Sequence, residues 1–77
     1  MLPYPDQVLD VRGLHCPMPV IKTKLAIAGM KPGEVLKVIS TDPAAKADIP
    51  VLLDRLGHDL ISIEERDQLF QFLIKRN

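Results

Sequence analysis

The chain has 77 residues, 47% of them hydrophobic, and its ten basic and ten acidic residues cancel to a formal net charge of zero. This length allows one domain, residues 1–77, with a single modest core, and the hydrophobic content excludes an intrinsically disordered chain. The neutral charge and the few aromatic residues (one tyrosine, two phenylalanines, no tryptophan) argue against phosphate neutralisation and base stacking, so no direct nucleic-acid binding is expected.

The first predicted element is a strand that follows a loose lead-in over residues 1–6. Residues 7–12, QVLDVR, alternate in polarity, which is typical of a strand with Leu9 and Val11 facing the core. Gly13 then permits a turn, because glycine tolerates a positive φ.

A helix and a second strand follow this turn. The helix is predicted from residue 17 to about residue 29, and KPGE over residues 31–34 has proline and glycine where a turn needs them. The β-branched residues within 34–41 predict the second strand.

A second helix is predicted after Asp42, because an aspartate before a proline is typical of a helix N-cap. Pro50 would remove a backbone donor and clash with the preceding turn, so we expect this helix to be interrupted. A first turn over 43–47 would then be followed by a new start with Asp48 as its cap. Gly57 is predicted to end the helix in the left-handed conformation.

The last two elements are predicted to form a hairpin, with strands at 59–65 and 69–76 and a turn at 66–68. The order β-α-β-α-β-β predicts an α/β two-layer sandwich (α+β), with a four-stranded mixed sheet, two helices on one face and the first two strands parallel. The core face of the hairpin is predicted to hold Phe70, Phe72, Ile74, Ile61 and Ile63, and its outer face Gln71, Ser62 and Lys75.

The single cysteine, Cys16, lies in the stretch HCPMP at the start of the first helix. If Cys16 is the N-cap, Pro17 and Pro19 occupy the first and third helical positions, where a missing N–H removes no helical bond. The helix dipole then favours the thiolate and lowers the pKa of the thiol. Because the two prolines have no N–H to donate, the thiolate is only partly stabilised and stays nucleophilic. Cys16 is therefore predicted to be a reactive thiol, and the alternative is a small buried hydrophobic residue.

The first helix has more apolar residues than one face can bury. At about 100° per residue they form two stripes, and the first is assigned to the core. If the second stripe is exposed, it forms a docking strip for a donor or acceptor protein. Alternatively, the sheet covers both stripes. The solvent accessibility of Ile21 and Leu25 decides between these two alternatives. The first stripe contains Val20, Thr23, Ala26, Ile27 and Met30, and the second contains Met18, Ile21, Leu25 and Ala28.

Three residues near Cys16 are candidates for partner docking. Arg12, His15 and Lys22 are predicted to raise the local positive potential, which favours the thiolate and an anionic partner surface. Side chains next to each other at a turn usually diverge, so His15 is assigned a spacer role, and His58 a structural role at a helix end. Cys16, His15 and His58 lack the spacing of zinc ligands, so no metal site is predicted.

Cysteine content and hydropathy indicate the cellular compartment in which the protein is expected. One cysteine cannot form an internal disulfide, so nothing indicates an oxidising compartment. The first residues lack the basic and apolar segments of a secretion signal, and no apolar run is long enough to cross a membrane. We therefore expect a cytoplasmic protein without a membrane partner.

Several segments together resemble the TusA/SirA-type sulfur-carrier family, whose motif is Cys-Pro-x-Pro after a short strand and a glycine turn. The motif occurs here within LDVRGLHCPMPV, residues 9–20. The resemblance continues through KPGE (31–34), TDPAAKADIP (41–50) and GHDL (57–60) to a C-terminal hairpin that ends in basic residues. It therefore covers nearly the whole chain in the expected order.

The resemblance implies a fold of the same element order, similar to the C-terminal domain of translation initiation factor 3. It also implies that Cys16 is the catalytic residue, which accepts sulfane sulfur as a persulfide from a cysteine desulfurase or rhodanese-type donor and passes it to an acceptor protein. Gly13, Pro17, Met18 and Pro19 would shape the site. No bound cofactor is required, because a single thiol suffices for attack on a donor's sulfur.

We therefore expect a sulfurtransferase in the sense of persulfide relay, acting in 2-thiouridine synthesis at the tRNA wobble position. Within the same chemistry, the sulfur could serve molybdenum-cofactor maturation or sulfur oxidation instead. The alternative from another class is a non-catalytic RNA- or protein-interaction module with Cys16 buried. Under that alternative Cys16→Ser leaves function intact, whereas a sulfur carrier loses its relay and keeps its fold.

Overall fold

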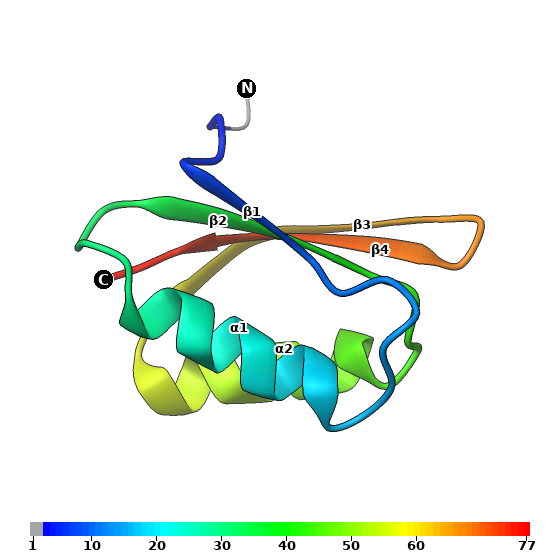
Figure 1. Cartoon of the computed structure of the whole chain (residues 1–77). Helices are drawn as coiled ribbons and strands as arrows, with labels where there is room; N and C mark the ends of the chain where they lie inside the picture. The colour runs from blue at the N-terminus through cyan, green and yellow to red at the C-terminus, as the bar shows by residue number, and fades with distance from the viewer. Residues whose placement is uncertain (1–2) are drawn as a thin grey trace.

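Six elements follow one another in the predicted order in the computed structural model, which describes residues 3–77 (Figure 1). Residues 1 and 2 of the predicted lead-in lie outside the described residues, and residues 3–6 precede the first strand without helix or strand. Neither helix within 3–77 is long and apolar enough to span a membrane. The elements are β1 (Gln7–Asp10), α1 (Met18–Ala28), β2 (Val35–Ser40), α2 (Ala45–Leu56), β3 (Asp59–Arg66) and β4 (Leu69–Lys75).

The sheet is mixed, as predicted, with the strand order β1-β2-β4-β3. β1 pairs with β2 in parallel, and β4 pairs antiparallel with both β2 and β3. Both helices lie on the same face of this sheet (Figure 1). Because β1 and β2 are parallel, the connections to α1 and α2 leave the sheet at the same end, and this brings residues 11–17 beside residues 41–44.

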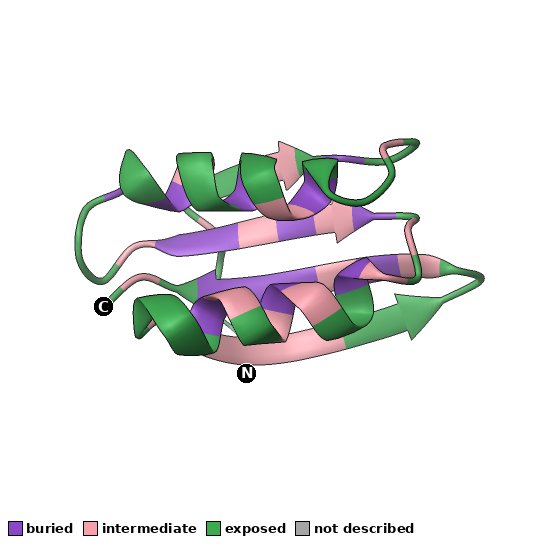
Figure 2. Ribbon diagram, turned by 90° about the horizontal axis from the view of Figure 1, so that it is seen from below, coloured by how far each residue is buried: buried purple, intermediate pink, exposed green. Residues whose placement is uncertain are grey.

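The core lies between the helices and the covered face of the sheet. Figure 2 shows the buried residues along β2 and β4 and on the sides of the helices that face them. Leu9 packs against this core and Val11 is fully buried, which confirms their predicted orientation. The largest fully buried side chains include Phe72, Ile27, Leu36, Ile49, Leu53, Ile74 and Val38.

The hairpin of β3 and β4 turns through Asp67 and Gln68, both with positive φ, 51° and 64°. Such a two-residue turn matches the twist of the paired strands. Phe70, Phe72 and Ile74 are buried, as predicted. The prediction for Ile61 is wrong, because a register irregularity between Leu60 and Ser62 shifts the alternation; Leu60 and Ile63 pack against the core instead.

The predicted interruption of the second helix is wrong, because α2 runs without a break from Ala45 to Leu56 with Pro50 inside it. Ala45, Ile49 and Leu53 recur at four-residue spacing and are all buried against the sheet, and this packing outweighs the lost backbone bond. The residue whose carbonyl loses its donor, Lys46, is exposed, so water can replace that donor.

The two ends of α2 also differ in how well they were predicted. The predicted cap Asp42 lies before the structural N-cap, Ala44, although its side chain accepts a hydrogen bond from the Ala44 N–H at 3.1 Å. Gly57 ends the helix with φ 79°, which confirms the predicted left-handed residue. His58 has a structural contact, because its Nδ1 accepts a hydrogen bond from the Asn77 N–H at 3.1 Å.

Candidate functional site

Cys16 lies in the connection from β1 to α1, and its side chain is exposed. This exposure contradicts the alternative of a buried hydrophobic cysteine. The predicted N-cap is wrong by one residue: Pro17 is the N-cap and Met18 begins the helix, and the Cys16–Pro17 peptide bond is cis. Pro17 and Pro19 nevertheless remain at positions where a helix has no use for their missing N–H groups.

Two hydrogen bonds from the β2–α2 connection hold the loop of Cys16. The Cys16 N–H donates to Asp42 Oδ2 at 2.8 Å, and the Gly13 N–H donates to Thr41 Oγ1 at 2.9 Å. Gly13 has φ 80°, a conformation that favours glycine and confirms the predicted turn. The loop is therefore fixed at two points against residues that lie far along the chain.

A third contact involves the thiol itself. Cys16 Sγ lies 3.7 Å from Asp48 Oδ2, in the first half of α2, and the geometry is that of a hydrogen bond from the thiol to the carboxylate. Desolvation of the thiol raises the pKa of Cys16, and the negative charge of Asp48, the hydrogen bond to it and the charge of Asp42 raise it further.

The prediction of a lowered cysteine pKa is therefore wrong. The Met18 N–H, at the start of α1, donates to the His15 carbonyl at 2.9 Å. Cys16 also precedes the N-cap, so its side chain is not placed to cap the helix. The side chains that contact Cys16 are instead two carboxylates: Asp42 accepts from its backbone N–H, and Asp48 accepts from its thiol.

The predicted positive surroundings are not what shifts the thiol pKa: among residues 3–77 the charged groups that act on it are two carboxylates, Asp48 at the thiol and Asp42 at the Cys16 N–H. Arg12 pairs with Asp10 at 2.7 Å; its hydrogen bonds lower the pKa of the Asp10 carboxyl, and the carboxylate raises the pKa of Arg12. His15 is exposed, and within residues 3–77 its side chain makes no hydrogen bond to Cys16, so the structure offers no Cys–His pair.

The second apolar stripe of α1 is exposed, which decides between the two interpretations of this helix. Met18, Ile21 and Leu25 have exposed fractions of 39%, 43% and 68%, and we call these three residues the α1 strip. Thr23 and Ile27 of the other stripe are buried, as predicted. The α1 strip starts two residues after Cys16, so a partner that covers the thiol can also cover this strip.

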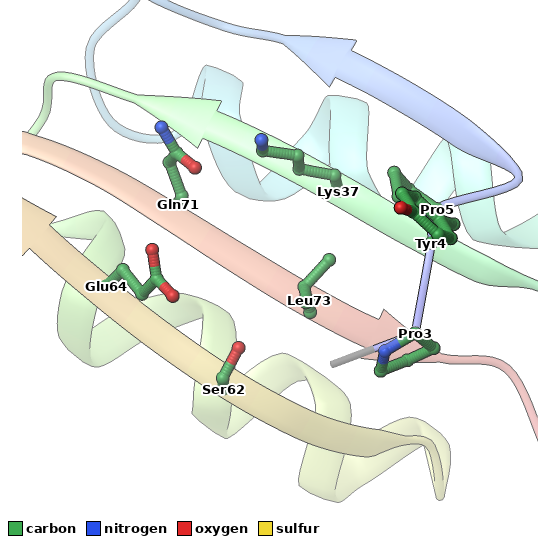
Figure 3. A pocket seen from close by; sticks show the side chains of 8 residues that line it. All are labelled: Pro3, Tyr4, Pro5, Lys37, Ser62, Glu64, Gln71 and Leu73. Carbon is green, nitrogen blue, oxygen red and sulfur yellow. The ribbon is translucent and has the colours of Figure 1, made fainter. Parts of the chain in front are cut away.

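A hollow on the opposite face of the sheet was not predicted. Figure 3 shows Tyr4, Lys37, Glu64 and Leu73 around it, with the helices behind the sheet. None of its lining residues belongs to the loop of Cys16 or to the α1 strip. Among residues 3–77, no group of three or more His, Cys, Asp or Glu side chains is placed to hold a metal ion.

The sequence that forms this site matches a known protein family. The family described as sulfurtransferase TusA matches residues 7–76, which is nearly the whole chain. The chain belongs to this TusA family. The resemblance seen in the Cys-Pro-x-Pro motif is thereby confirmed, and membership in the family supports a sulfur-carrier role in the broad sense.

Individual relatives agree with this assignment. The sulfur carrier protein TusA of Allochromatium vinosum is 39% identical over 72 residues, covering 94% of this chain and 95% of the relative. The putative sulfur carrier protein YrkI of Bacillus subtilis is 38% identical over 71 residues, covering 92% and 95%. The crystal structure of the SirA-like protein of Desulfitobacterium hafniense superposes with a TM-score of 0.80 at 24% identity, over 90% of this chain and 95% of that one, and it confirms the fold.

Asp42 and Asp48 were predicted only as helix caps, and their contacts with Cys16 were not predicted. A signal was available in the predicted TusA-type order of elements. Because the first two strands were predicted to be parallel, the residues that follow each of them had to lie at the same end of the sheet. Cys16 follows the first strand and Asp42 follows the second, so their proximity could have been inferred.

Proposed function

We propose that this protein carries sulfane sulfur as a persulfide on Cys16, which it accepts from a cysteine desulfurase or rhodanese-type donor and gives to an acceptor protein. The observation that carries the proposal is the exposure of the only cysteine of the chain, on a loop that two hydrogen bonds hold in place. Gly13, Pro17, Met18 and Pro19 shape this loop.

The transfer needs no group beyond the two thiols and the moving sulfur. The Cys16 thiol loses its proton, and the thiolate attacks the terminal sulfur of the donor persulfide. The donor's sulfur–sulfur bond breaks, and the donor thiolate leaves and takes up a proton. The sulfane sulfur keeps its oxidation state throughout, so no external oxidant or reductant is needed. Attack by an acceptor thiolate on the Cys16 persulfide repeats the same step and empties the carrier.

The transfer can be tested by the intact mass of the protein after incubation with a cysteine desulfurase and cysteine, or with a rhodanese and its sulfur donor. We expect a gain of one sulfur atom, reversed by reductant and mapped to Cys16 by fragmentation. No gain with either donor class would contradict the proposal. Bovine serum albumin offered the same donors serves as the control for non-specific sulfur uptake.

We propose that donor and acceptor dock on the α1 strip, with Arg12, His15 and Lys22 at its edge. Leu25 is the most exposed member of the strip, and a few apolar residues usually provide most of the binding energy of an interface. Leu25→Glu is expected to weaken the donor complex about 30-fold, equivalent to about 2 kcal/mol. Isothermal titration calorimetry against the donor measures this change.

Val8→Glu provides a matched control for the docking experiment. Val8 is also an exposed apolar residue, with an exposed fraction of 59%, but it lies on β1 and outside the α1 strip. We expect Val8→Glu to bind the sulfur donor protein as tightly as the wild type does. Equal affinities of Leu25→Glu and the wild type would show that the donor does not use the strip.

We propose thiolation of the tRNA wobble uridine, in the cytoplasm, as the pathway served. The carrier would act on a protein that thiolates tRNA and would not itself bind the nucleic acid, in keeping with the zero net charge of the chain. Molybdenum-cofactor maturation and sulfur oxidation use the same transfer step and differ only in the acceptor protein.

A further inference from the structure

The contact between Asp48 and the Cys16 thiol has no role in the transfer step described so far. Within residues 3–77, Cys16 Sγ is the only hydrogen-bond or ion-pair partner of the Asp48 side chain. The nearby cation on α2, Lys46, pairs with Glu65 at 2.8 Å. Asp48 is partly buried, and among residues 3–77 no cation is paired with its carboxylate.

We infer that Asp48 is a positioning residue of the sulfur-transfer site, which holds the unloaded Cys16 thiol against α2 and releases Cys16 once it carries sulfur. This inference rests on the proposed function for Cys16 as the carrier residue. It concerns how the side chain is placed before and after loading, and Asp48 itself takes no part in bond making.

The unloaded state follows from hydrogen-bond chemistry. An ionised carboxylate can only accept hydrogen bonds, so the 3.7 Å contact requires a protonated thiol as the donor. A thiolate in the same place would put two negative charges side by side, with Asp42 as a third close by. The contact therefore favours the protonated form of the thiol while the carrier is empty, and only the minor thiolate population attacks a donor.

Among residues 3–77, the charged groups that shift the pKa of the thiol are both carboxylates, and neither shift is offset by a cation. Asp42 faces it from the β2–α2 connection and Asp48 from α2. The first turn of α1 has no charged residue, and on the loop of Cys16 itself Arg12 is paired with Asp10. His15 precedes Cys16 and is exposed to solvent. The raised pKa of the thiol, caused by desolvation and by these two carboxylates, agrees with this arrangement.

Loading reverses the interaction with Asp48. A persulfide is more acidic than the thiol from which it forms, so the loaded Cys16 gives its proton to solvent near neutral pH and becomes an anion. It then has no hydrogen to donate, and the carboxylate repels it. The terminal sulfur turns away from α2 towards solvent, where an acceptor thiol can reach it. Asp48 thereby distinguishes the empty carrier from the loaded one.

The unloaded state is tested by the thiol pKa of Asp48→Asn, measured from the pH dependence of Cys16 alkylation by iodoacetamide. Asparagine keeps the shape of the side chain and removes its charge, so we expect the pKa of the Cys16 thiol to fall. At pH 7 the thiolate population then rises, and although each thiolate is less nucleophilic, we expect the net alkylation rate to rise about threefold.

Two further variants separate the charge at this position from general effects. Asp54→Asn makes the same change at an exposed position of α2, where no contact with Cys16 exists, and is expected to leave the pKa unchanged. Asp48→Glu restores a carboxylate and is expected to restore the high pKa. If Asp48→Asn and Asp54→Asn have the same thiol pKa, the inference is overturned, even where sulfur loading of Cys16 still proceeds.

The loaded state is tested on wild-type protein treated with inorganic polysulfide, which requires no donor enzyme. Nuclear Overhauser contacts between the side chains of Cys16 and Asp48 are expected in the empty protein and are expected to be lost after loading. Contacts that persist in the loaded protein would overturn the release. An Asp48-dependent pKa in a protein that no enzymatic donor loads would instead count against the proposed function alone.

Discussion

Cys16→Ser is expected to abolish sulfur relay completely while the free energy of unfolding changes by less than about 0.5 kcal/mol. A serine hydroxyl is not ionised at neutral pH and forms no persulfide, so neither loading nor onward transfer can occur. Cys16 is exposed, and a serine hydroxyl can keep the hydrogen bond to Asp48, so the fold has little to lose. Mass spectrometry after donor treatment and urea unfolding measure the two effects.

The same variant tests the pathway in cells. Cells whose only copy is Cys16→Ser are expected to lose 2-thiouridine from their tRNA to the same extent as cells without the protein. A normal 2-thiouridine content with abolished loading would exclude the tRNA pathway and favour molybdenum-cofactor maturation or sulfur oxidation. Full biological function of Cys16→Ser would instead show that the protein acts without its thiol, which contradicts a sulfur carrier. For sulfur loading of the purified protein, the control is wild-type protein alkylated at Cys16, because its thiol is blocked without a change of sequence.

Periodicity was sufficient to predict the layers of this fold. The alternation in 69–76 placed Phe70, Phe72 and Ile74 in the core, and helical periodicity separated the buried Thr23 and Ile27 from the exposed α1 strip. These patterns depend on which side chains avoid water, and hydrophobic burial is the dominant favourable term in folding. Element order and the parallel pairing of the first two strands followed from the same patterns.

Local rules failed where tertiary packing opposed them. Pro50 is a helix breaker by intrinsic propensity, yet the burial of Ile49 and Leu53 on either side keeps α2 continuous. The shift of the core-facing position from Ile61 to Leu60 is a second case, because a one-residue irregularity in pairing reverses the alternation and leaves no mark in the composition of the strand.

The chemistry of the site was less predictable than its location. The motif pointed to Cys16, and the structure places that residue at the surface. Its pKa was predicted in the wrong direction, because the prediction considered only the helix that follows Cys16 in sequence. Desolvation is the largest cause of the raised pKa, and the two groups that raise it further, Asp48 and Asp42, are 32 and 26 residues away along the chain and come close to Cys16 only through the fold.

Phe72→Ala is expected to lower the free energy of unfolding by about 3–5 kcal/mol, the usual effect of removing a buried aromatic ring. Phe72 is fully buried at the centre of β4, where it pairs with Val38 of β2 and Ile63 of β3. At about 0.05–0.15 kcal/mol per residue, a 77-residue domain has a total stability of about 4–12 kcal/mol. The substitution would therefore remove a large part of it, as urea unfolding can measure.

Gln71→Ala is the matched control, because Gln71 precedes Phe72 on β4 and lies on the opposite face of the sheet, beside the hollow of Figure 3. Both variants put alanine at neighbouring positions of one strand, so the loss of strand propensity is common to both and their difference measures the burial of Phe72. We expect Gln71→Ala to change the stability by less than about 1 kcal/mol. Equal losses in the two variants would show that the helix-covered face of the sheet does not hold the main core.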